Sequence, residues 1–152
     1  MFKTIDTNQK DVKLTVFSSD EKSFMVTATL VEKAGHAFLI NSKFTQSDSK
    51  EIVEYLKNND LSLDKIFIIH GDPDYYFGLE SIKAIYPKAI AYATESTVEH
   101  IVHSVLGKLK VWKDVLGENA PSNVVLPQVF KEKSIDFQGL TFELVGLDHY
   151  RT

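Results

Sequence analysis

His70, Asp72 and Asp74 are the residues of this chain whose types and spacing are best suited to chemistry. They follow directly after the apolar run Ile66–Ile69. Alternate side chains of an extended backbone point to the same side, so these three are expected to converge at the end of a buried strand. An imidazole and two carboxylates that converge in this way are suitable ligands for a divalent metal ion. The pattern therefore predicts a metal site.

Two alternatives to this metal site remain open from the residues alone. In the first, Asp74 stabilises the start of the following helix and His70 bonds to the backbone, and the cluster holds no ion. In the second, His100 and His103 hold a metal, because residues three apart lie on the same face of a helix. Only Glu99 adds an acidic ligand nearby, and we expect these two histidines to lie on a solvent-exposed face instead.

The composition indicates one domain over residues 1–152 and excludes several classes of protein. Hydrophobic residues make up 43% and charged residues 25% of the chain, and the formal net charge is -4. No basic stripe indicates nucleic-acid binding, and no apolar run approaches the roughly 20 residues of a membrane-spanning helix. The sequence has no cysteine, which excludes disulfides and thiolate zinc sites, and residues 1–12 are too polar for a signal peptide. We therefore expect a cytoplasmic protein that binds neither nucleic acid nor membranes.

The hydrophobic pattern predicts an α/β fold with a mixed sheet. Alternating or continuous apolar residues predict strands at 12–18, 24–31, 37–40, 65–69, 89–93, 124–130, 134–137 and 140–145. Helices are expected to begin at Thr45 and, in a capping box, at Ser96, and a third is expected over 76–85. Strands at both ends with alternating strands and helices between them favour a mixed sheet with helices on one face.

The run from His70 to Tyr75, with Gly78 behind it, resembles the metal-binding motif of the metallo-β-lactamase superfamily. That motif reads His-x-His-x-Asp-His at the end of a buried strand, and the predicted order of elements is similar to the N-terminal half of the family's αββα sandwich. The resemblance places His70 at the first histidine ligand and Asp74 at the aspartate that binds the second metal and orients the attacking water. It places Asp72 at the middle histidine, where a carboxylate is still a ligand. Tyr75 stands at the last histidine and is a poor ligand, because a phenol ionises only near pH ~10.

The resemblance also implies a cofactor and a function. The family takes a further ligand from a loop after a later strand, where His149 or Asp148 is available. The implied metal ligands are then His70, Asp72, Asp74 and His149, with Asp74 as the catalytic residue. The implied cofactor is a divalent metal, zinc in the first place, with iron, manganese or no metal as alternatives.

Three functions follow from these alternatives. With zinc or manganese bound, the protein would hydrolyse a small-molecule substrate such as an ester, thioester, lactone or phosphoester. Without metal, it would be a non-catalytic binding or structural module. The carboxylate of Asp72 resembles a flavodiiron-type branch of the superfamily, which implies an iron-binding redox or oxygen-sensing protein as the third function.

The family's enzymes also have a second half, with a further aspartate and histidine, which these 152 residues do not contain. One half of such a sandwich would expose an apolar sheet face and an open edge. We therefore expect a homodimer, in which a second copy covers that face by two-fold symmetry. Sedimentation that shows a monomer at micromolar concentration would contradict this expectation.

Overall fold

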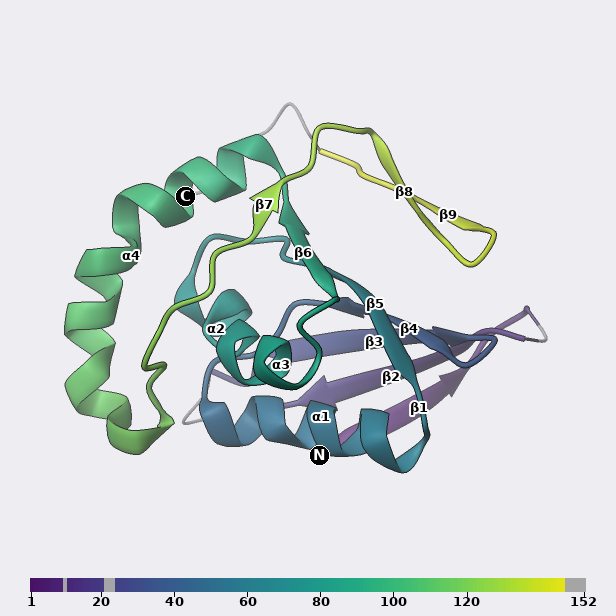
Figure 1. The fold of residues 1–152 in the computed structure, drawn as a ribbon, viewed down its shortest axis with the longest axis horizontal. Helices are drawn as coiled ribbons and strands as arrows, with labels where there is room; N and C mark the ends of the chain where they lie inside the picture. Colours follow the sequence, from purple (N-terminus) through teal and green to yellow (C-terminus); the bar gives the residue numbers. More distant parts are fainter. Residues whose placement is uncertain (10, 21–23, 147–152) are drawn as a thin grey trace.

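One seven-stranded mixed sheet forms the centre of the protein (Figure 1). The structure is a computed structural model and describes residues 1–9, 11–20 and 24–146. The strands lie side by side in chain order: β1 (Phe2–Asp6), β2 (Lys13–Ser18), β3 (Thr27–Lys33), β4 (His36–Ile40), β5 (Ser62–Phe67), β6 (Ile90–Ala93) and β7 (Gln128–Val129). Neighbouring strands are antiparallel from β1 to β4 and parallel from β4 to β7.

The helices pack on one face of this sheet (Figure 1). They are α1 (Gln46–Asn58), α2 (Pro73–Tyr76), α3 (Leu79–Ile85) and α4 (Glu95–Leu116), followed by the short 3-10 helix η2 (Gly117–Asn119). Helix and strand side chains form one hydrophobic cluster there, in which Leu30, Leu56 and Ile66 are fully buried. The predicted mixed α/β architecture with helices on one face is therefore confirmed. Within the described ranges, no helix is long and apolar enough to cross a bilayer.

Two threonines set the starts of the longer helices. Thr45 accepts a hydrogen bond from the backbone N–H of Asp48 at 3.1 Å, which confirms the predicted start of α1. Helix α4 begins earlier than the predicted capping box at Ser96. Its cap is Thr94, which directly follows β6 and accepts from the backbone N–H of Thr97 at 3.3 Å. The prediction was wrong here because Thr94 and Ser96 are both suitable caps. The helix begins at the first of them, because β6 ends at Ala93.

A second hydrophobic cluster lies on the opposite face of the sheet, because neighbouring strand residues such as Leu30 and Val31 point to opposite sides. It joins the sheet to a hairpin, β8 (Ser134–Phe137) and β9 (Leu140–Glu143), which forms a separate two-stranded sheet. The buried members of this cluster are Val31, Phe38, Phe67, Ile135 and Phe137. The C-terminal hairpin is confirmed, and it covers part of the face that the sequence analysis left bare.

The rest of that face bears on the predicted homodimer. Strand pairing places Ile5 opposite Leu14 and Ile90 opposite Lys65, on the same side as the second cluster. Ile5 and Ile90 are 42% and 38% exposed. Apolar surface thus remains on this face beside the hairpin, and the homodimer stays a prediction.

The predicted and observed elements differ mainly at their ends. The sequence predicts no strand at Phe2–Asp6, because these residues show no apolar alternation, which agrees with an edge strand whose five residues are all exposed. The strand predicted from Phe24 begins at Thr27, because Phe24 and Met25 have positive φ angles. The helix predicted over 76–85 is two short helices, α2 and α3, and the strand predicted over 124–130 is confined to β7.

Lys43, between β4 and α1, is a buried charge whose removal should stabilise the fold. Its side chain is 0% exposed and its Nζ lies 3.9 Å from Glu51 Oε1. Neither of these two atoms has a hydrogen-bond partner among the residues that the structure describes. Burial lowers the pKa of Lys43 from its ordinary value, and the nearby carboxylates of Asp48, Glu51 and Asp20 offset only part of this effect.

Lys43→Met is expected to raise the free energy of unfolding by about 1 kcal/mol at neutral pH, because methionine fills similar space without a buried charge. The folded-state pKa of Lys43 lies below its unfolded-state value of 10.5, so the unfolded state holds the proton more tightly. The gain should therefore be larger at pH 7 and decrease as the pH rises toward 10.5. Urea unfolding at pH 7 and pH ~10 measures this. The matched control is Lys50→Met on the exposed side of α1, and equal effects of the two substitutions would contradict the prediction.

Candidate functional site

The predicted metal-binding run does not continue the strand as expected. Strand β5 ends at Phe67, and an irregular segment leads to Asp72, the extended residue that precedes α2. Asp74 lies in the first turn of α2. The expected alternation of His70, Asp72 and Asp74 on one extended backbone is therefore wrong at Asp74, because a helical residue no longer follows the two-residue period of a strand.

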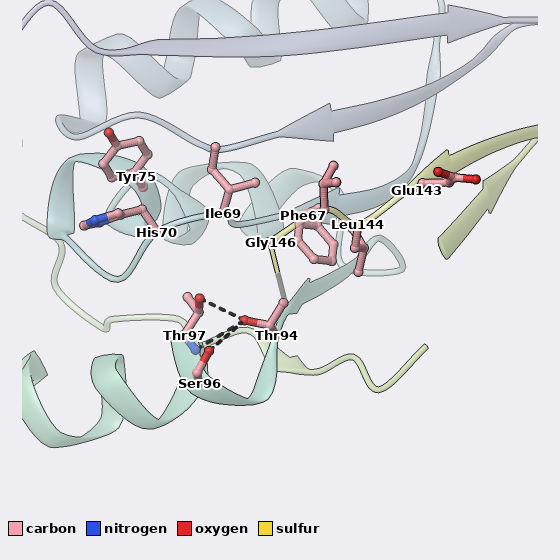
Figure 2. A pocket seen from close by; sticks show the side chains of 11 residues that line it. Phe67, Ile69, His70, Tyr75, Thr94, Ser96, Thr97, Glu143, Leu144 and Gly146 are labelled. Atoms are coloured by element: carbon pink, nitrogen blue, oxygen red, sulfur yellow. Dashed lines mark hydrogen bonds between the residues drawn. The ribbon is translucent and has the colours of Figure 1, made fainter. Parts of the chain in front are cut away.

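Three of the four predicted ligands line two different cavities. His70 lines a cavity of about 490 Å³, which we call the His70 cavity. Its walls come from Phe67, Ile69, His70, Tyr75, Thr94, Ser96, Thr97, Glu143, Leu144, Val145 and Gly146. Figure 2 shows His70 and Tyr75 together on one side of it and the three hydroxyl residues at the start of α4 on the other. Asp72 and Asp74 instead line a smaller cavity of about 210 Å³ beside Trp112, which we call the Trp112 cavity.

The imidazole of His70 is held by its neighbours in the turn. The backbone N–H of Asp72 donates to His70 Nδ1 at 3.2 Å, and the ring lies 5.0 Å from that of Tyr75. Asp72 Oδ2 is also 3.5 Å from Nδ1, a contact that would need a proton on that nitrogen. The shorter bond from the amide assigns a lone pair to Nδ1, which places the proton of the neutral ring on Nε2. In this arrangement His70 is a hydrogen-bond donor through Nε2.

The described part of the predicted donor set does not by itself form a site for the metal that the sequence implied. In the part of the chain that the structure describes, no three His, Cys, Asp or Glu side chains are grouped to hold a metal ion. Asp72 Oδ1 instead lies 3.8 Å from Lys108 Nζ of α4. Burial, and then the negative charges of Asp74 and Asp72, raise the pKa of Tyr75, which keeps it a neutral phenol and a poor ligand. The remaining predicted ligand, His149, and its alternative Asp148 lie outside the described residues.

Comparisons with known proteins identify the architecture. No protein-family model and no curated protein matches the sequence. Among solved structures, the protein is similar to a metallo-β-lactamase from Hirschia baltica, with a TM-score of 0.61, 14% identity, and coverage of 92% of this chain and 58% of that one. It is also similar to the metallo-β-lactamase FIM-1 from Pseudomonas aeruginosa in its mono-zinc form, with a TM-score of 0.57, 10% identity, and coverage of 88% of this chain and 54% of that one. A third similar structure is the metallo-β-lactamase DIM-1, with a TM-score of 0.53, 16% identity, and coverage of 90% of this chain and 54% of that one.

The chain has the metallo-β-lactamase fold. This confirms the resemblance read from the motif and the order of elements. The chain spans somewhat more than half of the length of these solved structures. At identities of 10% to 16% this similarity is one of fold.

Within this metallo-β-lactamase fold, the carboxyl of Asp74 is partly removed from water. Burial raises its pKa, and the negative charge of Asp72 raises it further. The backbone of Asp74 itself, His70 and Lys108 act in the opposite direction. Tyr76, the next residue but one, is fully buried in the helix-side core, and burial raises its pKa also. The turn thus directs Tyr76 into the core and Tyr75 toward the His70 cavity.

The contribution of α4 to this site was not predicted from the sequence. Thr94, Ser96 and Thr97 reach the His70 cavity because β5 and β6 are parallel neighbours, and their carboxyl ends meet at one edge of the sheet. That rule was the signal that would have found them. His100 was expected on an exposed face, which is wrong, because its ring packs against Gly71 and a Cβ there would lie 2.3 Å from His100 Cδ2.

Proposed function

We propose that this protein binds a small organic ligand with an apolar body and a carbonyl-type acceptor group in the His70 cavity, without needing a bound metal. The observation that carries the proposal is the cavity itself, about 490 Å³ in volume, in which apolar walls and hydrogen-bonding side chains converge. Phe67, Ile69 and Leu144 supply apolar surface, and Ile69 is 57% exposed, which leaves it available for contact. Small esters, thioesters and lactones have this chemistry.

Hydrogen-bond donors on two sides of the cavity support an acceptor group as the polar part of the ligand. On one side, His70 Nε2 carries the ring proton, because Nδ1 accepts from the backbone of Asp72. On the other side, Thr94 Oγ1 donates to Thr97 Oγ1 at 3.0 Å, which leaves the hydroxyl proton of Thr97 for the ligand. Glu143 also lines the cavity, and its negative charge disfavours a ligand with negative charge.

A lactone titration tests this function. With γ-octalactone as the probe, the amide NMR signals of Ile69 and Thr97 are expected to shift, both before and after treatment with EDTA. His70→Ala should weaken binding about tenfold, because it removes one hydrogen bond and part of the wall. The matched control is His103→Ala, an exposed histidine of α4 outside the cavity, which should leave the affinity unchanged. Equal affinity of the two variants, or binding that is lost with EDTA, would contradict the proposal.

A second candidate is the metal-dependent hydrolysis of a small ester, thioester, lactone or phosphoester. It is favoured by one observation, that His70 Nδ1 and Asp72 Oδ2 lie 3.5 Å apart in the segment that follows β5, where the resemblance places the ligand motif. His149 would have to complete the set. Elemental analysis of protein purified without chelator separates the functions. Two zinc or manganese ions per chain would support the hydrolase and iron with visible absorption a redox protein, whereas lactone binding by metal-free protein would support the proposal above.

A further inference from the structure

The Trp112 cavity is built from a combination of side chains that the His70 cavity does not have. It lies where the start of α2, the middle of α4 and the residues before β3 and α1 meet. Aromatic rings, carboxylates and one ammonium group form its walls: Phe24, Phe44, Trp112, Asp72, Asp74 and Lys108. Aromatic surface combined with negative charge is the environment that recognises organic cations.

The three aromatic rings pack against one another and hold their orientations. Trp112 makes edge-to-face contacts with Phe24 and Phe44, with centroid distances of 5.5 Å and 5.2 Å and interplanar angles of 83° and 89°. Phe44 is 1% exposed and anchors the group in the core, while Phe24 is 55% exposed. Rings that are nearly perpendicular present their faces in different directions, and an aromatic face attracts a cation through its negative quadrupole.

The charges around the cavity leave one carboxylate for a ligand. Asp72 Oδ1 is 3.8 Å from Lys108 Nζ, so these two charges largely offset each other. Within residues 24–146, no ion-pair partner lies within 4 Å of the Asp74 carboxylate, although it lines the same cavity. The lining therefore carries a net negative charge next to aromatic rings. A hydrated metal ion would gain nothing from the rings, whereas an alkylated ammonium ion contacts both surfaces.

We propose that the Trp112 cavity binds a small organic cation, an alkylammonium or quaternary ammonium ion, between the carboxylate of Asp74 and the rings of Phe24 and Trp112, which Phe44 supports from the core. The volume of about 210 Å³ limits the ligand to a compact cation. Lys108 lowers the affinity, because its ammonium group lines the same space and repels the ligand. This site does not depend on the ligand proposed for the His70 cavity.

Trp112 is the single tryptophan of the chain, so its fluorescence reports on this cavity directly. Titration with choline chloride is expected to change the fluorescence saturably, while sodium chloride at the same concentrations does not. The uncharged analogue 3,3-dimethylbutan-1-ol, which has the same shape, should bind about tenfold more weakly, because it lacks the charge that attracts the rings and Asp74. Absence of a saturable change with choline, or equal binding of the two molecules, would overturn the proposal.

Charge variants test the roles of Asp74 and Lys108. Asp74→Asn should weaken choline binding about tenfold and Lys108→Met should strengthen it several-fold, because each removes one charge beside the ligand. The matched controls are Asp114→Asn and Lys110→Met, exposed residues of α4 that do not line the cavity. Circular dichroism identifies any variant that fails to fold. Unchanged affinity in folded Asp74→Asn, or weaker binding in folded Lys108→Met, would contradict the assignment.

Discussion

Gly78→Ala is expected to lower the free energy of unfolding by about 3 kcal/mol or more, because the added methyl group has no space. A Cβ at position 78 would lie 1.9 Å from the backbone oxygen of Ser42 and 2.9 Å from Ser49 Cβ. The backbone N–H of Gly78 donates to the carbonyl of Lys43 at 3.0 Å, which holds α3 against the loop between β4 and α1. The φ angle at Gly78 is -71°, so close approach, not backbone conformation, requires glycine here.

Gly107→Ala provides the matched control for this prediction. Gly107 lies within α4, and a Cβ there would meet nothing within 4 Å. Alanine should therefore stabilise the protein by about 0.5 to 1 kcal/mol, because glycine loses more backbone entropy when it enters a helix. Urea unfolding followed by circular dichroism measures both variants. If Gly78→Ala is as stable as Gly107→Ala, the close packing of α3 against this loop is wrong.

Phe137→Ala is expected to lower the free energy of unfolding by about 3 to 5 kcal/mol, because it leaves a cavity between the hairpin and the sheet. Phe137 of β8 is 2% exposed, and its ring centroid lies 5.9 Å from that of Phe38, which is 1% exposed. Lys65 also donates a hydrogen bond to the carbonyl of Asp136, so the hairpin is joined to β5 by polar as well as apolar contacts.

The control for Phe137→Ala is a substitution in the segment that follows the same hairpin. Val145 is 93% exposed, and Val145→Ala should change the stability by no more than about 0.5 kcal/mol. Thermal or urea unfolding of both variants gives the comparison. Equal, small effects would mean that the hairpin does not cover the second sheet face in solution. The apolar residues of that face would then need another cover, such as the second copy in the predicted homodimer.

The sequence determined the local structure and the fold class through features that act over a few residues. Thr45 and Asp48 fixed the start of α1, and the stripe that includes Ile52 and Leu56 fixed its buried face. The apolar run before His70 predicted a buried strand, although β5 ends at Phe67. With the motif beside them, these elements were sufficient to identify the metallo-β-lactamase fold.

The tertiary structure alone decided how the candidate site is divided. His70 and Asp74 are four residues apart, but the chain enters α2 between them and turns their side chains into different cavities. Contacts between residues that are far apart in the sequence then complete the site: His100 packs against Gly71, and Lys108 lies beside Asp72. Spacing along the chain constrains only the local backbone, whereas the direction of a side chain depends on backbone angles and on packing partners that are distant in sequence.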